Sequence, residues 1–106
     1  MDTIDFDARL APYRAAIAAD PSCYVAHLNL GCAYAALDTL ESARQSFHQA
    51  LLLAPGVPET HYFLVRAYGL QRLHEQAAQV FDVATKRFPE WGEAHARLYR
   101  AYHEVL

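Results

Sequence analysis

Apolar residues recur along the chain every three to four positions, which is the spacing of one face of an α-helix. Leu30, Ala33 and Tyr34 share such a face, and Leu64 and Tyr68 share another further along the chain. This pattern predicts an all-α fold. About six helices are expected, at residues 4–19, 23–36, 39–53, 58–70, 73–87 and 91–105.

Residues typical of helix ends lie between these segments. Ser22 is suited to be the N-cap of the second helix, and Asp38 with Glu41 forms a capping-box pattern for the third. Pro58 falls at the first position of the fourth helix, where proline is favoured. Pro12 lies inside the first helix, so a kink or a restart is expected there. All connections are short, which predicts that successive helices run antiparallel.

The sequence also repeats itself with a fixed period. A histidine opens each first-helix pattern, at His27, His61 and His95. The second half of the unit repeats as well: Ala43, Phe47, Ala50 and Pro55 return as Ala77, Phe81, Ala84 and Pro89. A fixed period of this length is typical of stacked helical units, each too small to bury its apolar face alone.

The chain therefore resembles the tetratricopeptide-repeat (TPR) family, whose unit is a helical hairpin of about 34 residues. Residues 24–57 and 58–91 match two full units, through the leucine, tyrosine, alanine, phenylalanine and proline positions. Residues 4–23 match a second helix only, and residues 92–106 match a first helix only. The resemblance implies a right-handed solenoid of antiparallel helical hairpins, forming one domain over residues 1–106.

Small residues mark the expected helix contacts. Ala43 and Ala77 each stand four residues before a phenylalanine, and helices approach to about 8 Å only where side chains are small. The chain departs from the family pattern at three related places. Val65 and Tyr99 replace a small glycine, and Arg9 replaces an alanine.

The composition narrows the functional classes. An apolar fraction of 54% and an aromatic fraction of 12% exclude a disordered chain. The net charge of −3 gives no electrostatic reason to expect nucleic acid or an acidic membrane surface as a partner. No apolar run is long enough for a membrane span, and the N-terminal residues do not resemble a secretory signal. A cytoplasmic location is expected.

The repeated histidines invite a metal hypothesis, which geometry disfavours. Equivalent positions on successive units should lie about 10 Å apart, whereas zinc needs ligands within about 2.1 Å of one ion. We therefore expect each imidazole to fill the space that an indole fills in the family, with no metal. The other three histidines are expected to face solvent: His48, His74 and His103.

Nothing in the sequence points to catalysis or to a cofactor. There is no Gly-rich phosphate loop, no nucleophile with an evident base, and no meaningful pair of carboxylates. Cys23 and Cys32 fall on one predicted helix, about 13 Å apart along its axis. That separation exceeds the roughly 7 Å between Cα atoms that a disulfide allows, so both should be thiols.

In the TPR family the first helices line a concave groove that holds extended peptides or partner helices. Aromatic residues and arginine, which most often anchor interfaces, occur at the matching positions. The candidate peptide-binding residues are Asn29, Cys32, Tyr62, Phe63, Arg66, Arg97 and Arg100. The alternative is an ordinary solvated helix face, with Glu59 and Glu93 offsetting the positive charge.

The resemblance implies non-catalytic protein–protein binding, by an adaptor, an assembly factor or a chaperone-like subunit. A second possibility is self-assembly through the open terminal helices, in a head-to-tail contact that grows rings or filaments. Arg9 and Tyr99 disfavour that contact because both are bulky at positions that should be small. A third possibility is a regulatory fragment of a larger enzyme.

Overall fold

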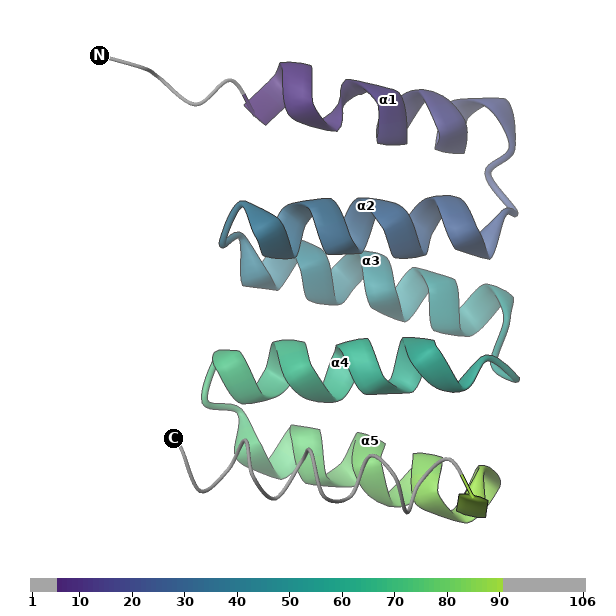
Figure 1. Ribbon diagram of the computed structural model, residues 1–106, viewed down its shortest axis with the longest axis vertical. Helices are drawn as coiled ribbons and strands as arrows, with labels where there is room; N and C mark the ends of the chain where they lie inside the picture. Colours follow the sequence, from purple (N-terminus) through teal and green to yellow (C-terminus); the bar gives the residue numbers. More distant parts are fainter. Residues whose placement is uncertain (1–5, 91–106) are drawn as a thin grey trace. The chain divides into compact units, whose positions relative to one another are not determined.

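Five α-helices and no strand make up the part of the chain that the computed structural model describes, residues 6–90 (Figure 1). The all-α prediction is confirmed for these residues. Helices α2 to α5 begin within one residue of the predicted positions, and the sixth predicted helix, 91–105, lies outside the described residues. The helices are α1 (Phe6–Ala19), α2 (Tyr24–Ala36), α3 (Leu40–Leu53), α4 (Pro58–Leu70) and α5 (His74–Arg87).

The chain divides at the turn after α3 into two compact units, Met1–Pro55 and Gly56–Leu106. In the first unit, α2 packs against both α1 and α3. In the second unit, α4 packs against α5. Within each unit consecutive helices run antiparallel, as the short connections predict (Figure 1). A single domain and a continuous solenoid of both units remain predictions.

Small residues lie at the centre of each hairpin. Ala43 of α3 and Ala77 of α5 are both 0% exposed, as expected for close contacts between helices. In the first unit, Gly31 of α2 lies directly against the ring of Phe47, which is also buried. The helices approach closely here because glycine has no side chain to separate them.

The second hairpin does not reproduce this glycine–phenylalanine contact. Val65 stands at the position of Gly31 and is buried, whereas Phe81, the counterpart of Phe47, is only half-buried. A Cβ at residue 31 would collide with the Phe47 ring. A valine at the equivalent position therefore excludes the same ring placement, and Phe81 is more exposed than Phe47.

Both hairpin turns use one type of helix end. Asp38 and Arg72, at equivalent positions of the repeat, adopt left-handed backbone with φ of 60° and 62°. The backbone N–H of Thr39 donates to the carbonyl of Tyr34 at 2.9 Å, and the second turn repeats this bond. These bonds define Schellman motifs, in which the left-handed residue follows the last helical turn.

Asp38 is therefore not the N-cap of α3, and the predicted capping box is wrong. Helix α3 begins after Thr39, whose hydroxyl donates to the carbonyl of Tyr34 at 2.8 Å instead of capping α3. Ser22 is not an N-cap either. Its backbone N–H and its hydroxyl both donate to the carboxylate of Asp20, at 3.2 and 2.8 Å, and α2 begins two residues later.

The two prolines expected inside helices have different outcomes. Pro58 occupies the first turn of α4, as predicted. Pro12 lies within α1, which runs without interruption from Phe6 to Ala19, so the expected restart does not occur. Over residues 6–90, no helix combines the length and the apolar character that crossing a bilayer requires.

Candidate protein-binding surface on α4

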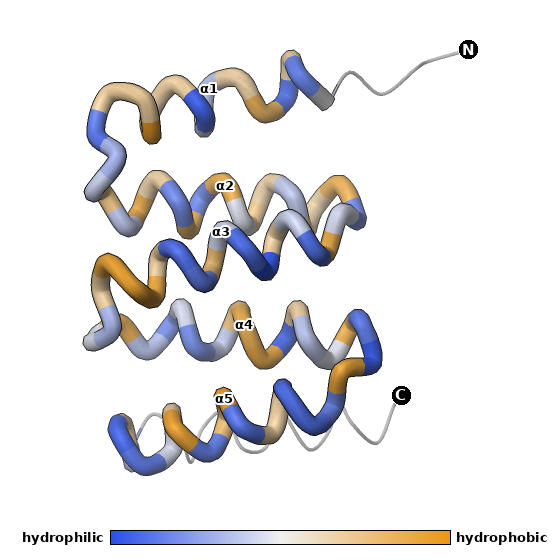
Figure 2. Tube along the Cα trace, turned by 180° about the vertical axis from the view of Figure 1, so that it is seen from behind, coloured by the Kyte–Doolittle hydropathy of each residue, from blue (hydrophilic) through white to orange (hydrophobic). Residues whose placement is uncertain are grey.

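Helix α4 combines one buried face with one exposed face. Thr60, Leu64 and Ala67 are buried and recur at three- and four-residue spacing, which places them on the face that packs in the core. Figure 2 shows the resulting mixture of apolar and polar positions along α4. Among the residues between these positions, His61 and Val65 are also buried, whereas Tyr62 and Arg66 lie on the other side of the helix.

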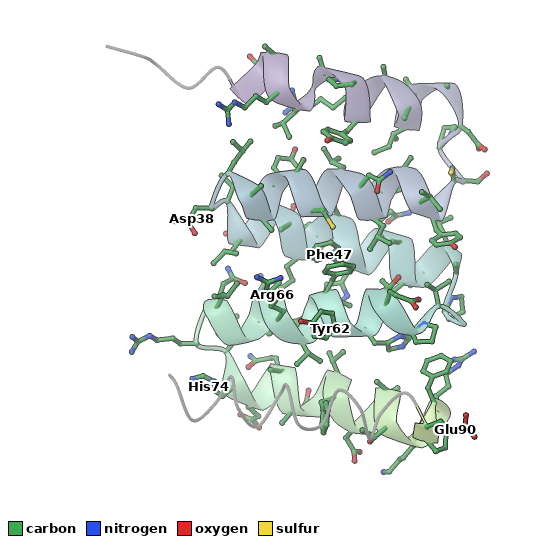
Figure 3. The ribbon with its side chains drawn as sticks, viewed as in Figure 1. Asp38, Phe47, Tyr62, Arg66, His74 and Glu90 are labelled. Atoms are coloured by element: carbon green, nitrogen blue, oxygen red, sulfur yellow. The ribbon has the colours of Figure 1, made fainter. Side chains whose placement is uncertain are left out.

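Three predicted site residues lie on the exposed side of α4. The rings of Tyr62 and Phe63 are 5.7 Å apart between centroids, at an interplanar angle of 56°, and both side chains are half-buried. Arg66 follows Tyr62 by one turn and is exposed. Figure 3 shows both labelled side chains projecting from α4. The helix thus presents two aromatic rings in mutual contact beside a guanidinium group.

Two further residues extend this surface, and the prediction of site residues omitted both. Glu59 precedes Tyr62 by one turn and is exposed, and Leu70 follows Arg66 by one turn with 42% of its surface exposed. We call Glu59, Tyr62, Phe63, Arg66 and Leu70 the α4 surface. The spacing of three and four residues was available in the sequence, but which stripe of α4 stays uncovered depends on packing.

The other predicted site residues are less fully described. Asn29 is exposed and Cys32 is half-buried, and their spacing of three places them on one side of α2. Both belong to the first unit, whereas the α4 surface belongs to the second. A single groove that joins them stays a prediction. Arg97 and Arg100 lie outside the described residues.

His61 is part of the core of the second unit. It is 3% exposed, its ring contacts the ring of Phe88 edge-on with centroids 5.4 Å apart, and Nδ1 lies 3.2 Å from the carbonyl oxygen of Val57. Burial lowers the pKa of His61, and the charge of Arg87 lowers it further, against the opposing effect of the Val57 carbonyl. These contacts support the prediction that this imidazole packs where the family has an indole.

The remaining histidines have mixed outcomes. His27 is half-buried, and its Nε2 lies 2.9 Å from the carbonyl oxygen of Pro21. His74 is exposed, as predicted. His48 is half-buried, so the prediction that it faces solvent is wrong, and burial followed by the charge of Arg44 lowers its pKa. His95 and His103 lie outside the described residues.

The structure also bears on metal binding and on cysteine chemistry. Cys23 and Cys32 are both thiols, as their spacing predicts. Among the side chains of residues 7–90, no group of three or more histidine, cysteine, aspartate or glutamate residues is arranged to hold a metal ion.

No protein-family model matches the chain, and a search of curated proteins finds no significant match. A proposal of function therefore rests on the chemistry of the α4 surface. Paired aromatic rings offer apolar area, and a guanidinium offers a charged, hydrogen-bonding anchor. This combination is typical of residues that anchor protein–protein interfaces.

Proposed function

We propose that this protein is a TPR-like protein-interaction module that binds a peptide or a helix of a partner protein. The recurrence of structure at the period of the sequence repeat supports this assignment. The buried Ala43 and Ala77 stand one period apart, and so do the left-handed residues Asp38 and Arg72. Two hairpins built on one plan are what a helical repeat requires.

The α4 surface is the observation that carries the proposal. Tyr62 and Phe63 would supply apolar burial, and Arg66 would pair with a carboxylate of the partner. Exposed Leu70 would add apolar contact next to Arg66. Glu59, two turns before Arg66, would repel a second acid at the other end of the surface. The partner segment is therefore apolar, with an acidic residue opposite Arg66.

In the full proposal the two units stack as a right-handed solenoid of six helices. Asn29 and Cys32 of α2 would then continue the α4 surface in one direction, and Arg97 and Arg100 would continue it in the other. The resulting groove would carry positive charge, although the net charge of the protein is −3. Its partners are proteins rather than nucleic acids or membranes, and its location is cytoplasmic.

Charge reversal on the groove tests this function. The double variant Arg66→Glu with Arg100→Glu should lose capture of the partner from native lysate, because desolvated charge pairs typically cost about 2–5 kcal/mol when one member is removed. Arg72→Glu, at the exposed turn after α4, is the matched control and should bind like the parent. Far-UV circular dichroism should show unchanged helicity for all variants.

The pull-down result can contradict the proposal in two ways. If the double variant captures the same partner as well as the parent does, the groove does not bind it. If Arg72→Glu loses the partner to the same extent, binding depends on overall charge rather than on the α4 surface.

A further inference from the structure

Helix α1 corresponds to α3 in the sequence repeat, yet the two helices bury different faces. The correspondence rests on residues that stand one repeat period apart. Three corresponding pairs bear on packing: Arg9 with Ala43, Tyr13 with Phe47, and Ala16 with Ala50. The α3 members of these pairs are all at most 2% exposed. The α1 members are all exposed, with Tyr13 at 36%.

An adjacent side of α1 is the one that packs. Leu10 is buried and Ile17 is half-buried, and Tyr34 of α2 lies close enough to the guanidinium of Arg14 to raise its pKa. Helix α1 therefore uses one face against α2 and leaves exposed the face that in α3 is covered by α2. We call Arg9, Tyr13 and Ala16 the open face of α1.

The α2–α3 contact shows what kind of element covers such a face. It is an antiparallel helix, with a glycine, Gly31, against the aromatic ring of Phe47. Tyr13 stands at the equivalent position of α1, so a helix on the open face needs a small residue opposite Tyr13. One turn further along the antiparallel pair, Ala35 comes opposite Ala43. Arg9 replaces that alanine and is exposed, so a carboxylate on the covering helix would complement its charge there.

We infer that the open face of α1 docks a helix of another protein, with glycine or alanine against Tyr13 and an acidic residue against Arg9. A second copy of this chain fits less well. Gly31 is buried in its own hairpin, Val65 is buried in the second unit, and residue 99 is a tyrosine at the position that must be small. This surface lies wholly in the first unit and does not depend on the α4 surface.

The chain itself provides a probe, because α2 is the helix that covers the equivalent face of α3. Two labelled peptides copy residues 22–38, one with Ala35→Glu and one with Ala35→Lys. Each is titrated into the full chain under reducing conditions, and fluorescence anisotropy reports binding. The Glu peptide should bind about two- to fivefold more tightly, the range expected for one solvent-exposed charge pair.

Variants of the protein test the same contacts from the other side. Arg9→Glu should reverse the preference, so that the Lys peptide binds more tightly. Tyr13→Lys should abolish binding of both peptides. Leu52→Lys is the matched control, because Leu52 is a strongly exposed apolar residue of the same unit that lies on α3, and it should bind like the parent. Amide chemical shifts of the parent should move in α1 and not in α4.

Several results would overturn the inference. The open face would be excluded as a docking site for this kind of helix if neither peptide binds or if both bind equally well. Chemical-shift changes confined to α4 would exclude it too. Concentration-dependent self-association of the parent that Tyr13→Lys removes would instead make a second copy the occupant, which also overturns it. The chemical shifts of the parent keep the test decisive even if Tyr13→Lys does not fold.

Discussion

Gly31 of α2 lies so close to Phe47 of α3 that a Cβ at residue 31 would stand 2.5 Å from Cε1 of the ring. Such a contact is well inside van der Waals distance, and the 2% exposure of Phe47 leaves the ring little room to move. The closeness of α2 and α3 therefore depends on the missing side chain of one residue. The second hairpin, with Val65 at this position, must pack its phenylalanine differently.

The variant Gly31→Ala should destabilise the protein although alanine favours helices. Overpacking typically costs about 1–3 kcal/mol, whereas replacing glycine by alanine inside a helix typically gains about 1 kcal/mol. A net loss of up to about 2 kcal/mol in the free energy of unfolding is expected from urea titration. Gly56→Ala is the control, because a Cβ there meets nothing within 4 Å. Equal stability of the two variants would show that the Phe47 ring yields.

The variants Ala43→Leu and Ala77→Leu should each lower the free energy of unfolding by about 1–3 kcal/mol. Both alanines are 0% exposed, so the three added carbons have no space between the helices. Ala78→Leu, at an exposed neighbour on α5, should change stability by less than about 0.5 kcal/mol. If the urea midpoints of the two core variants equal that of the parent, the two helices of each hairpin can move apart to fit leucine without losing stability.

The variant Arg72→Gly should stabilise the protein by about 1 kcal/mol. Arg72 has φ of 62°, a conformation that costs L-residues roughly 1–2 kcal/mol and glycine almost nothing. The greater flexibility of glycine in the unfolded chain offsets part of the gain. Arg72→Ala is the control, because it removes the charge but keeps the Cβ. If thermal melts rank Ala above Gly, the flexibility of glycine in the unfolded chain outweighs the cost of the left-handed backbone, and the prediction is wrong. If both variants are stabilised equally, the charge of Arg72 matters more than its backbone conformation.

Stability should fall on acidification because His61 is buried with a lowered pKa. The folded state then binds fewer protons than the unfolded state, so stability rises with pH. The contribution of His61 to the free energy of unfolding is fully present above the pKa of this histidine in the unfolded chain, about 6.5. That contribution is lost as the pH falls from this value through the lowered pKa of His61 in the folded state. His48 contributes in the same direction.

Urea titrations at several pH values between 7 and 5 measure this dependence. The variant His61→Phe should flatten it, since the replacement can pack against Phe88 without titrating. His74→Gln, at an exposed histidine, should keep the parental slope. A slope unchanged in His61→Phe would assign the pH dependence to other groups.

The positions of helices α2 to α5 follow from the sequence within one residue. Helical periodicity is a local property, and the sequence repeat shows the same pattern twice. The expected contacts at Ala43 and Ala77 are also present, because a small residue at a fixed place in each repeat has a packing role. The helix ends were harder to predict. Aspartate is a favoured N-cap residue, which is why Asp38 was expected to cap α3. Closure of the α2–α3 hairpin instead places Asp38 in left-handed backbone.

The candidate site divides in the same way. The sequence by itself grouped Tyr62, Phe63 and Arg66, through its resemblance to the groove-lining helices of the TPR family. Their spacings of three and four residues to Arg66 agree with one side of a helix. Only the tertiary structure decided that Leu70 joins them at the surface and that His48 is half-buried. Spacing sets which residues share a face of a helix, whereas exposure depends on which faces other helices cover, and that is settled by contacts between residues distant in the chain.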